Sequence, residues 1–174
     1  AITYKNKIAN DFESTSKIKL AQYRFVGNFH YPTGIMSDSG SSQWFDVDQS
    51  FYYSGIQNHQ IIFGLGAQSN FKLHQWTSDS ALDDHSRSNR QSIYAQDSWH
   101  INKSWVATYG IRYDQINFNN IPNSFNHMSP KVGLTYLATP TTKIKLIHSE
   151  AFRSPNTYEL RYNYVTDPLE YSSI

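Results

Sequence analysis

A short polar stretch of the sequence gathers several side chains that could bind a metal ion. These side chains, all between residues 78 and 87, are Asp79, Asp83, Asp84 and His85. Several carboxylate oxygens close together are the ligands that Ca²⁺ prefers, so the stretch could hold calcium or another ligand. A solvated loop is the commoner role of such a stretch, and Arg87 and Arg90 follow to neutralise part of its charge. We therefore assign no metal ligand here.

The rest of the sequence shows no arrangement typical of an enzyme. It contains no Cys, which excludes disulfides, zinc–thiolate sites and a thiol nucleophile. Its seven His are dispersed, without H-E-x-x-H or H-x-H spacing. The 15 basic and 14 acidic residues give a net charge of +1, which does not favour nucleic-acid binding. We expect a protein that is not an enzyme, needs no cofactor and binds no nucleic acid.

The segment 104–118 alternates in a way that predicts a β-strand with two unlike faces. The apolar face carries Trp105, Ala107, Tyr109, Ile111 and Tyr113. The other face carries Val106, Thr108, Gly110, Arg112 and Asp114. Successive strand side chains point to opposite faces, so one side meets apolar surroundings and the other a polar space. The wall of a water-filled membrane barrel has this pattern, as does a half-buried strand of a soluble β-sandwich.

Similar segments recur along the chain and are joined by connections of two kinds. We expect strands near 1–8, 17–31, 43–53, 58–77, 88–101, 104–118, 127–138 and 142–153. Short turns at 54–58, 102–104 and 138–142 alternate with longer polar loops at 32–42, 78–87 and 119–126. Short turns at one end and long loops at the other are typical of outer-membrane barrels. No stretch approaches the roughly 18 apolar residues of a membrane-spanning helix. The sequence thus predicts an all-β, antiparallel transmembrane β-barrel.

Asp97 breaks the alternation in its segment, because it falls on the same strand face as the apolar residues Ile93 and Trp99. A charge facing lipid at mid-depth would cost about 2 kcal/mol or more. We therefore expect Asp97 to point into the barrel.

Four ordered segments resemble the TonB-dependent outer-membrane receptors, which import ferric siderophores, cobalamin and similar scarce ligands. They are 93–99 (IYAQDSW), 110–114 (GIRYD), 129–136 (SPKVGLTY) and 149–156 (SEAFRSPN), the last being the most specific. The resemblance extends over roughly 17–162, in the family's order and at natural spacings.

This resemblance implies a place in the bacterial outer membrane and import of a ferric siderophore with energy derived from TonB. The family barrel has 22 strands around a plug, so about eight strands make a partial barrel. Residues 1–174 are then part of the barrel domain, with the plug domain and the C-terminal strands absent. The implied partners are a ferric siderophore or similar scarce ligand, outer-membrane lipid, and TonB through the missing plug region.

Candidate site residues follow from the chemistry of such ligands, which are often anionic, aromatic-rich and bulky. Guanidinium groups and flat aromatic faces suit them. The expected ligand contacts are Arg153, Tyr158, Arg161, Tyr162, Trp76 and Arg87. Arg112, Asp114 and Glu150 are expected to face the lumen and the plug. The alternatives are an interfacial girdle for the aromatic residues and a structural network of the wall for the charges.

Three other interpretations remain at this stage. Eight strands could close into a complete small outer-membrane barrel, such as an adhesin. The chain could be a soluble carbohydrate-binding β-sandwich, in which Tyr and Trp stack on sugars. Cobalamin could replace the siderophore as the cargo of a receptor.

Overall fold

The chain forms one antiparallel sheet in a computed structural model, which describes residues 1–32, 34–79, 82–119, 124–153 and 159–160. The strands are β1 (Ile2–Ala9), β2 (Phe12–Tyr31), β3 (Gly34–Tyr53), β4 (His59–Thr77), β5 (Asp83–His100), β6 (Trp105–Phe118), β7 (Phe125–Leu137) and β8 (Lys143–Ser149). Each strand pairs with the next one in the sequence, so the order in the sheet is β1 to β8 without a crossover. The prediction of an all-β chain with about eight antiparallel strands is confirmed.

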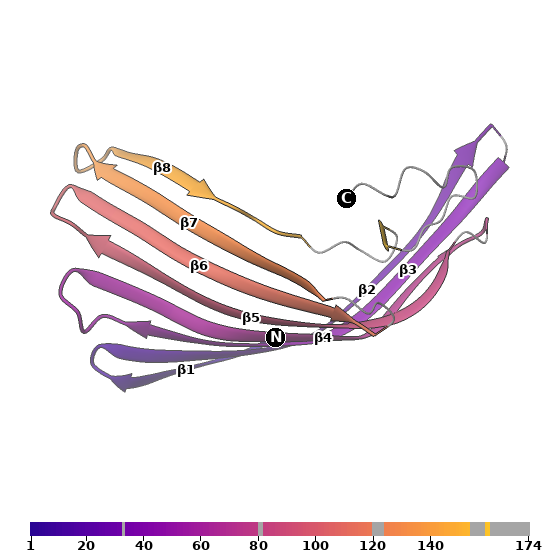
Figure 1. The fold of residues 1–174 in the computed structure, drawn as a ribbon, viewed down its shortest axis with the longest axis horizontal. Coiled ribbons are helices and arrows are strands. Elements are labelled where there is room, and N and C mark those ends of the chain that lie inside the picture. Colours follow the sequence, from indigo (N-terminus) through magenta and orange to yellow (C-terminus); the bar gives the residue numbers. More distant parts are fainter. Residues whose placement is uncertain (33, 80–81, 120–123, 154–158, 161–174) are drawn as a thin grey trace.

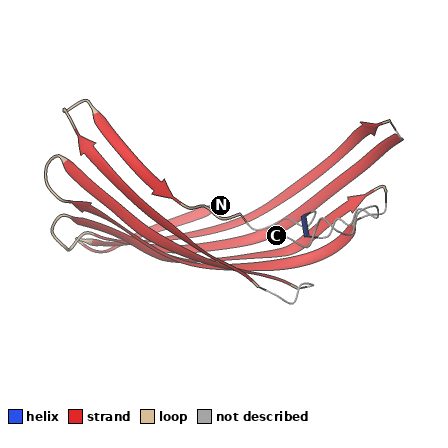
Figure 2. Cartoon of the chain, turned by 45° about the horizontal axis from the view of Figure 1, so that its top comes forward, coloured by secondary structure: helices blue, strands red, loops and turns tan. Residues whose placement is uncertain are grey.

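The sheet is a single curved layer with a concave and a convex side (Figures 1 and 2). Its edges are β1 and β8, which do not pair with each other. The interpretations as a closed eight-stranded barrel and as a two-layered sandwich are therefore wrong. The arrangement fits a section of the wall of a larger barrel. None of the described helical residues forms a segment long and apolar enough to cross a membrane.

Large apolar side chains cover one side of the sheet rather than a core. Leu65, Ile93 and Tyr113 lie in one row across β4, β5 and β6, and are 57%, 56% and 38% exposed. Among the described residues only three apolar side chains are buried, namely Leu82, Ile116 and Phe118. A soluble domain would bury such residues, whereas a barrel wall turns them towards lipid. The side that carries them is therefore the lipid-facing side, which is the convex outside of a barrel wall, and the opposite, concave side faces the lumen.

The strands run further than the sequence predicted. Residues 32–42 were expected to form a long loop, but β2 ends at Tyr31 and β3 begins at Gly34, whose φ of 136° requires glycine. In the same way β5 begins at Asp83 and β7 at Phe125, inside the expected loops. Backbone pairing continues after the apolar alternation has stopped, because hydrogen bonds between strands do not need apolar side chains. The prediction of long irregular loops at this end is wrong.

Gly64 makes room for an aromatic side chain on the concave side. The Tyr94 hydroxyl lies 3.0 Å from Asp48 Oδ2 and donates a hydrogen bond to it across β4. A Cβ at Gly64 would lie 2.6 Å from the Tyr94 hydroxyl oxygen and 2.6 Å from the Gln49 carbonyl oxygen. Glycine in a strand often marks such a close approach.

Gly64→Ala is therefore expected to destabilise the folded barrel by about 1–3 kcal/mol, since overpacking displaces Tyr94 and the β3 backbone. The measurement is the temperature at which the compact band of the folded protein disappears in unheated gels. Gly133→Ala is the matched control, because its Cβ would meet nothing closer than 3.5 Å. Equal melting temperatures for the two variants would show that Gly64 is not needed for this packing.

Candidate functional site on the concave face

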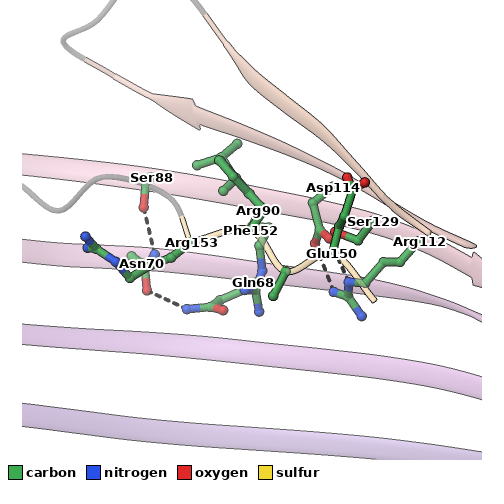
Figure 3. Close-up of a pocket in the computed structure, with 12 residues that line it drawn as sticks. Gln68, Asn70, Ser88, Arg90, Arg112, Asp114, Ser129, Glu150, Phe152 and Arg153 are labelled. Carbon is green, nitrogen blue, oxygen red and sulfur yellow. Dashed lines mark hydrogen bonds and ion pairs between the residues drawn. The ribbon is translucent and has the colours of Figure 1, made fainter. Parts of the chain in front are cut away.

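A hollow of about 500 Å³ lies on the concave face, between strands β4 to β7 and the segment that follows β8 (Figure 3). Its lining residues are Gln68, Asn70, Ser88, Arg90, Arg112, Asp114, Ile116, Ser129, Glu150, Ala151, Phe152 and Arg153. The strand register explains why they meet. Gln68, Arg90 and Ile116 form one row across three strands, and Arg112 pairs with Ser129 on the next. Paired residues share a face, so these rows all point to the concave side.

A charged network stiffens one side of the hollow. Arg112 donates two hydrogen bonds to Asp114, with Nε 2.7 Å from Oδ2 and the second nitrogen 2.9 Å from Oδ1. Asp114 is only 8% exposed, so it depends on this bidentate partner. The Arg112 guanidinium also lies 5.6 Å from the centre of the Tyr94 ring, and Tyr94 binds Asp48. The network thus joins β3, β5 and β6, as a structural role for Arg112 and Asp114 would require.

Amide and hydroxyl groups form a second, neutral chain along the hollow. Gln68 Nε2 donates to Asn70 Oδ1 at 2.9 Å, and Asn70 Nδ2 donates to Ser88 Oγ at 2.7 Å (Figure 3). These bonds fix the direction of the Asn70 side chain and leave a polar surface next to Arg90.

Two charged side chains of the hollow have no recorded hydrogen bond or ion pair within the described parts of the chain. Arg90 is half-buried beside Gln68 and Ile116, and Glu150 is exposed where β8 ends. A half-buried guanidinium has lost some water and gains from an incoming anionic group. Arg90 is therefore the group of the hollow best placed to bind an anion.

The segment after β8 is held against the wall by two contacts. Phe152 stacks on the His127 ring of β7, with the ring centres 4.6 Å apart. Arg153 forms two hydrogen bonds to Glu159, at 2.6 and 2.9 Å. These bonds raise the pKa of the Arg153 guanidinium above its usual value, so it stays charged. Arg153 thus lines the hollow with a permanent, partly neutralised positive charge.

The structure separates the sequence-predicted site residues into three groups. Arg112, Asp114, Glu150 and Arg153 come together around the hollow. Trp76 and Arg87 lie on the convex side. Trp76 pairs with Asp83, and both Asp83 and Arg87 share a face of β5 with Ile93. Tyr158, Arg161 and Tyr162 lie outside the described residues.

Arg90 was missed as a site residue from the sequence, where it was taken only as a partner for nearby acidic groups. It lies an even number of positions from Ser92 and Tyr94 on β5, and this alternation could have placed it on the lumen face. The amide–hydroxyl chain of Gln68, Asn70 and Ser88 was missed as well, because it depends on the pairing of β4 with β5.

The model of the family described as "TonB dependent receptor-like, beta-barrel" matches residues 2–173. The chain belongs to this family. TonB-dependent receptors lie in the bacterial outer membrane, and they are receptors and transporters rather than enzymes, so the expectation of a non-enzyme is confirmed. A search of curated protein sequences finds no match.

Two solved structures share the fold of this TonB-dependent receptor section. One is FpvA of P. aeruginosa in complex with a heterologous pyoverdine and iron, with a TM-score of 0.62 and 10% identity over 82% of this chain. The other is the copper transporter OprC, with a TM-score of 0.64 and 14% identity over 89% of this chain. This chain spans 25% of the FpvA chain and 30% of the OprC chain. At these identities the comparison shows the fold alone.

Asp97 corrects one expectation about the receptor wall. It pairs with Ile61 and Tyr109, so it lies on the convex, lipid-facing side and not inside. One of its carboxylate oxygens nevertheless has two partners, because Oδ2 lies 2.6 Å from His59 Nδ1 and accepts a hydrogen bond from the Tyr109 hydroxyl at 2.7 Å. The His59 ring stacks on Trp99 at 5.8 Å, near the turn that leads to β6. The predicted penalty is thus reduced by partners that the alternation alone did not show.

Proposed function

We propose that this chain is a section of an outer-membrane receptor that binds a ferric siderophore and imports it with energy derived from TonB. The section itself is passive in chemistry: it supplies part of the wall and part of the ligand-facing surface. Its assignment to residues 1–174 of the barrel domain is part of the same proposal.

The observation that carries the proposal is the half-buried Arg90 in a hollow that it shares with Arg112 and Arg153. Arg112 is held by Asp114 and Arg153 by Glu159, so Arg90 is the guanidinium left to donate hydrogen bonds to an anionic oxygen of a ligand. Phe152 adds an aromatic surface beside it. Beyond the described residues we propose Tyr158, Arg161 and Tyr162 as further contacts, whereas Trp76 and Arg87 have no place in the hollow.

The similarity to FpvA, bound to pyoverdine and iron in its structure, supports a siderophore as the cargo. The similarity to OprC, named a copper transporter, supports a metal ion as the second candidate. No observation favours cobalamin.

Arg90→Gln is expected to weaken binding of an anionic ferric siderophore about tenfold, which corresponds to about 1.4 kcal/mol for one charge-assisted hydrogen bond. The measurement is binding and uptake of ⁵⁵Fe-labelled siderophores by cells that carry the full receptor. Arg87→Gln is the control, because Arg87 lies on the same strand but on the convex side.

Equal binding by both variants would contradict the ligand role of Arg90. Normal binding with slow uptake in Arg90→Gln would indicate a contact with the plug instead. The cargo is tested separately by an immunoblot of outer membranes. A receptor band that increases in iron-starved cells supports a ferric cargo, and one that responds only to copper supports the second candidate.

A further inference from the structure

We propose that His74, Asp83 and His85 form a binding site for a divalent transition-metal ion at the outer ends of β4 and β5. One ligand atom from each of the three side chains lies within 4.8 Å of the others. The site is on the convex face, opposite to the hollow, and does not depend on the proposed cargo.

A β-bulge in β4 brings the two imidazoles together. Trp44 pairs with Asn70 while the preceding Gln43 pairs with Lys72, so Phe71 is an extra residue in β4. The extra residue reverses the alternation beyond it. Without the bulge, His74 would share the concave face with Gln68 and Asn70. With it, His74 lies directly opposite His85 on the convex face.

The distances suit a tetrahedral ion. His74 Nε2 is 3.3 Å and His85 Nε2 is 3.5 Å from the same atom, Asp83 Oδ1. Ligands at 2.0–2.1 Å from a tetrahedral Zn²⁺ are separated by about 3.3–3.4 Å, so both separations are already near those of a bound state.

One ring must turn before both nitrogens can bind the same ion. The two imidazoles are stacked, with centres 4.0 Å apart and planes inclined by 11°, so their nitrogen lone pairs point in similar directions. The side chain of His85 is 71% exposed and has the space to rotate. The cost of binding is thus a side-chain rotation, without any change in the strands.

The donor set selects the class of metal. Two imidazoles and one carboxylate suit Zn²⁺ or Cu²⁺, whereas Ca²⁺ needs six to eight oxygen ligands. The calcium cluster considered from the sequence is not assembled. Asp84, which is 8% exposed, pairs with Gln75 on the concave face, away from Asp83 and His85.

The site lies in water above the membrane. Apart from Asp97, apolar residues occupy the convex face of β5 between Ile93 and Trp99, and polar residues follow from Gln91 to Asp83. Ile93 and His85 are eight positions apart, which is about 26 Å along the strand. Metal ions in the external medium therefore reach the cluster directly, and a bound ion would clamp the loop end of the β4–β5 hairpin.

The test is a titration of the full receptor, purified in detergent, with Zn²⁺ alone and with Cu²⁺ alone. We expect a 1:1 site that His74→Ala and His85→Ala each weaken at least tenfold, because loss of even an outer-shell partner costs about 10–100-fold. The Cu²⁺ electron paramagnetic resonance spectrum should show coupling to two nitrogens in the wild type and to one in each variant.

His30→Ala is the matched control, since His30 is exposed at the same end of β2 and its side chain makes no hydrogen bond, ion pair or ring contact with the described residues. It should bind Zn²⁺ like the wild type. The proposal is overturned if no 1:1 site is found, if both cluster variants bind normally, or if His30→Ala weakens binding equally. His30 and His85 are exposed and His74 is half-buried, so a retained compact gel band verifies that each variant is folded.

Discussion

Arg112→Met is expected to destabilise the receptor barrel by about 1–3 kcal/mol, through the loss of the bidentate pair with Asp114. Asp114 is 8% exposed, and both of its oxygens bind Arg112. Removing one partner leaves a buried carboxylate unsatisfied, which costs more than the pair contributes. The side chain of Arg112 is 39% exposed, so water offsets part of the loss and the effect stays below that of a fully buried pair. The compact band should disappear at a lower temperature than in the wild type.

Lys131→Met provides the control for Arg112→Met. Lys131 lies on the same concave face, opposite Gly110, and the only side-chain hydrogen bond that it makes within the described residues is one of 3.3 Å to Gln96. Its replacement removes the same charge without exposing a carboxylate, so we expect no change in melting temperature. A similar loss in both variants would mean that the charge of the lumen matters and not the Asp114 pair. Unchanged stability of Arg112→Met would contradict the structural role of the network.

The strands of the membrane-spanning part could be predicted because their alternation is imposed by lipid. Leu65, Ile93 and Tyr113 each belong to the apolar face that the alternation predicts for their strand, and the structure places the three in one row. The ends of the strands could not be predicted in the same way. Above the membrane both faces of a hairpin meet water, so a polar strand such as the first part of β3 has the composition of a loop.

The residues of the candidate site could be predicted where their placement follows from alternation along one strand. They could not be predicted where it depends on how neighbouring strands pair. Arg112 and Asp114 lie on the predicted lumen face because they alternate with apolar residues of the same strand. Arg90 is brought beside Gln68 only by the pairing of β4 with β5, and His74 reaches His85 only through the bulge at Phe71. A bulge inverts every later position of its strand, and neither bulge nor register is written in the local sequence pattern.

His59→Phe is expected to destabilise the barrel by about 1–2 kcal/mol, at the lower end of the range for losing a partner of a charged group. Phenylalanine retains the ring that stacks on Trp99 but removes the Nδ1 atom that lies 2.6 Å from Asp97. The Tyr109 hydroxyl still donates to the carboxylate, which limits the loss. The measurement is the melting temperature of the receptor reconstituted in lipid, where the convex face meets hydrocarbon.

The double variant His59→Phe/Asp97→Leu decides whether Asp97 truly faces lipid. If it does, leucine removes the charge that has lost its partner, and the double variant should recover the stability of the wild type or exceed it. If Asp97 instead pointed into a wet lumen, leucine would gain nothing there and the two losses would add. Full recovery in lipid would also explain why a carboxylate can occupy the apolar face. It would show that His59 and Tyr109 only offset the cost of burying the Asp97 charge. An apolar pair of similar size would then give the barrel the same stability.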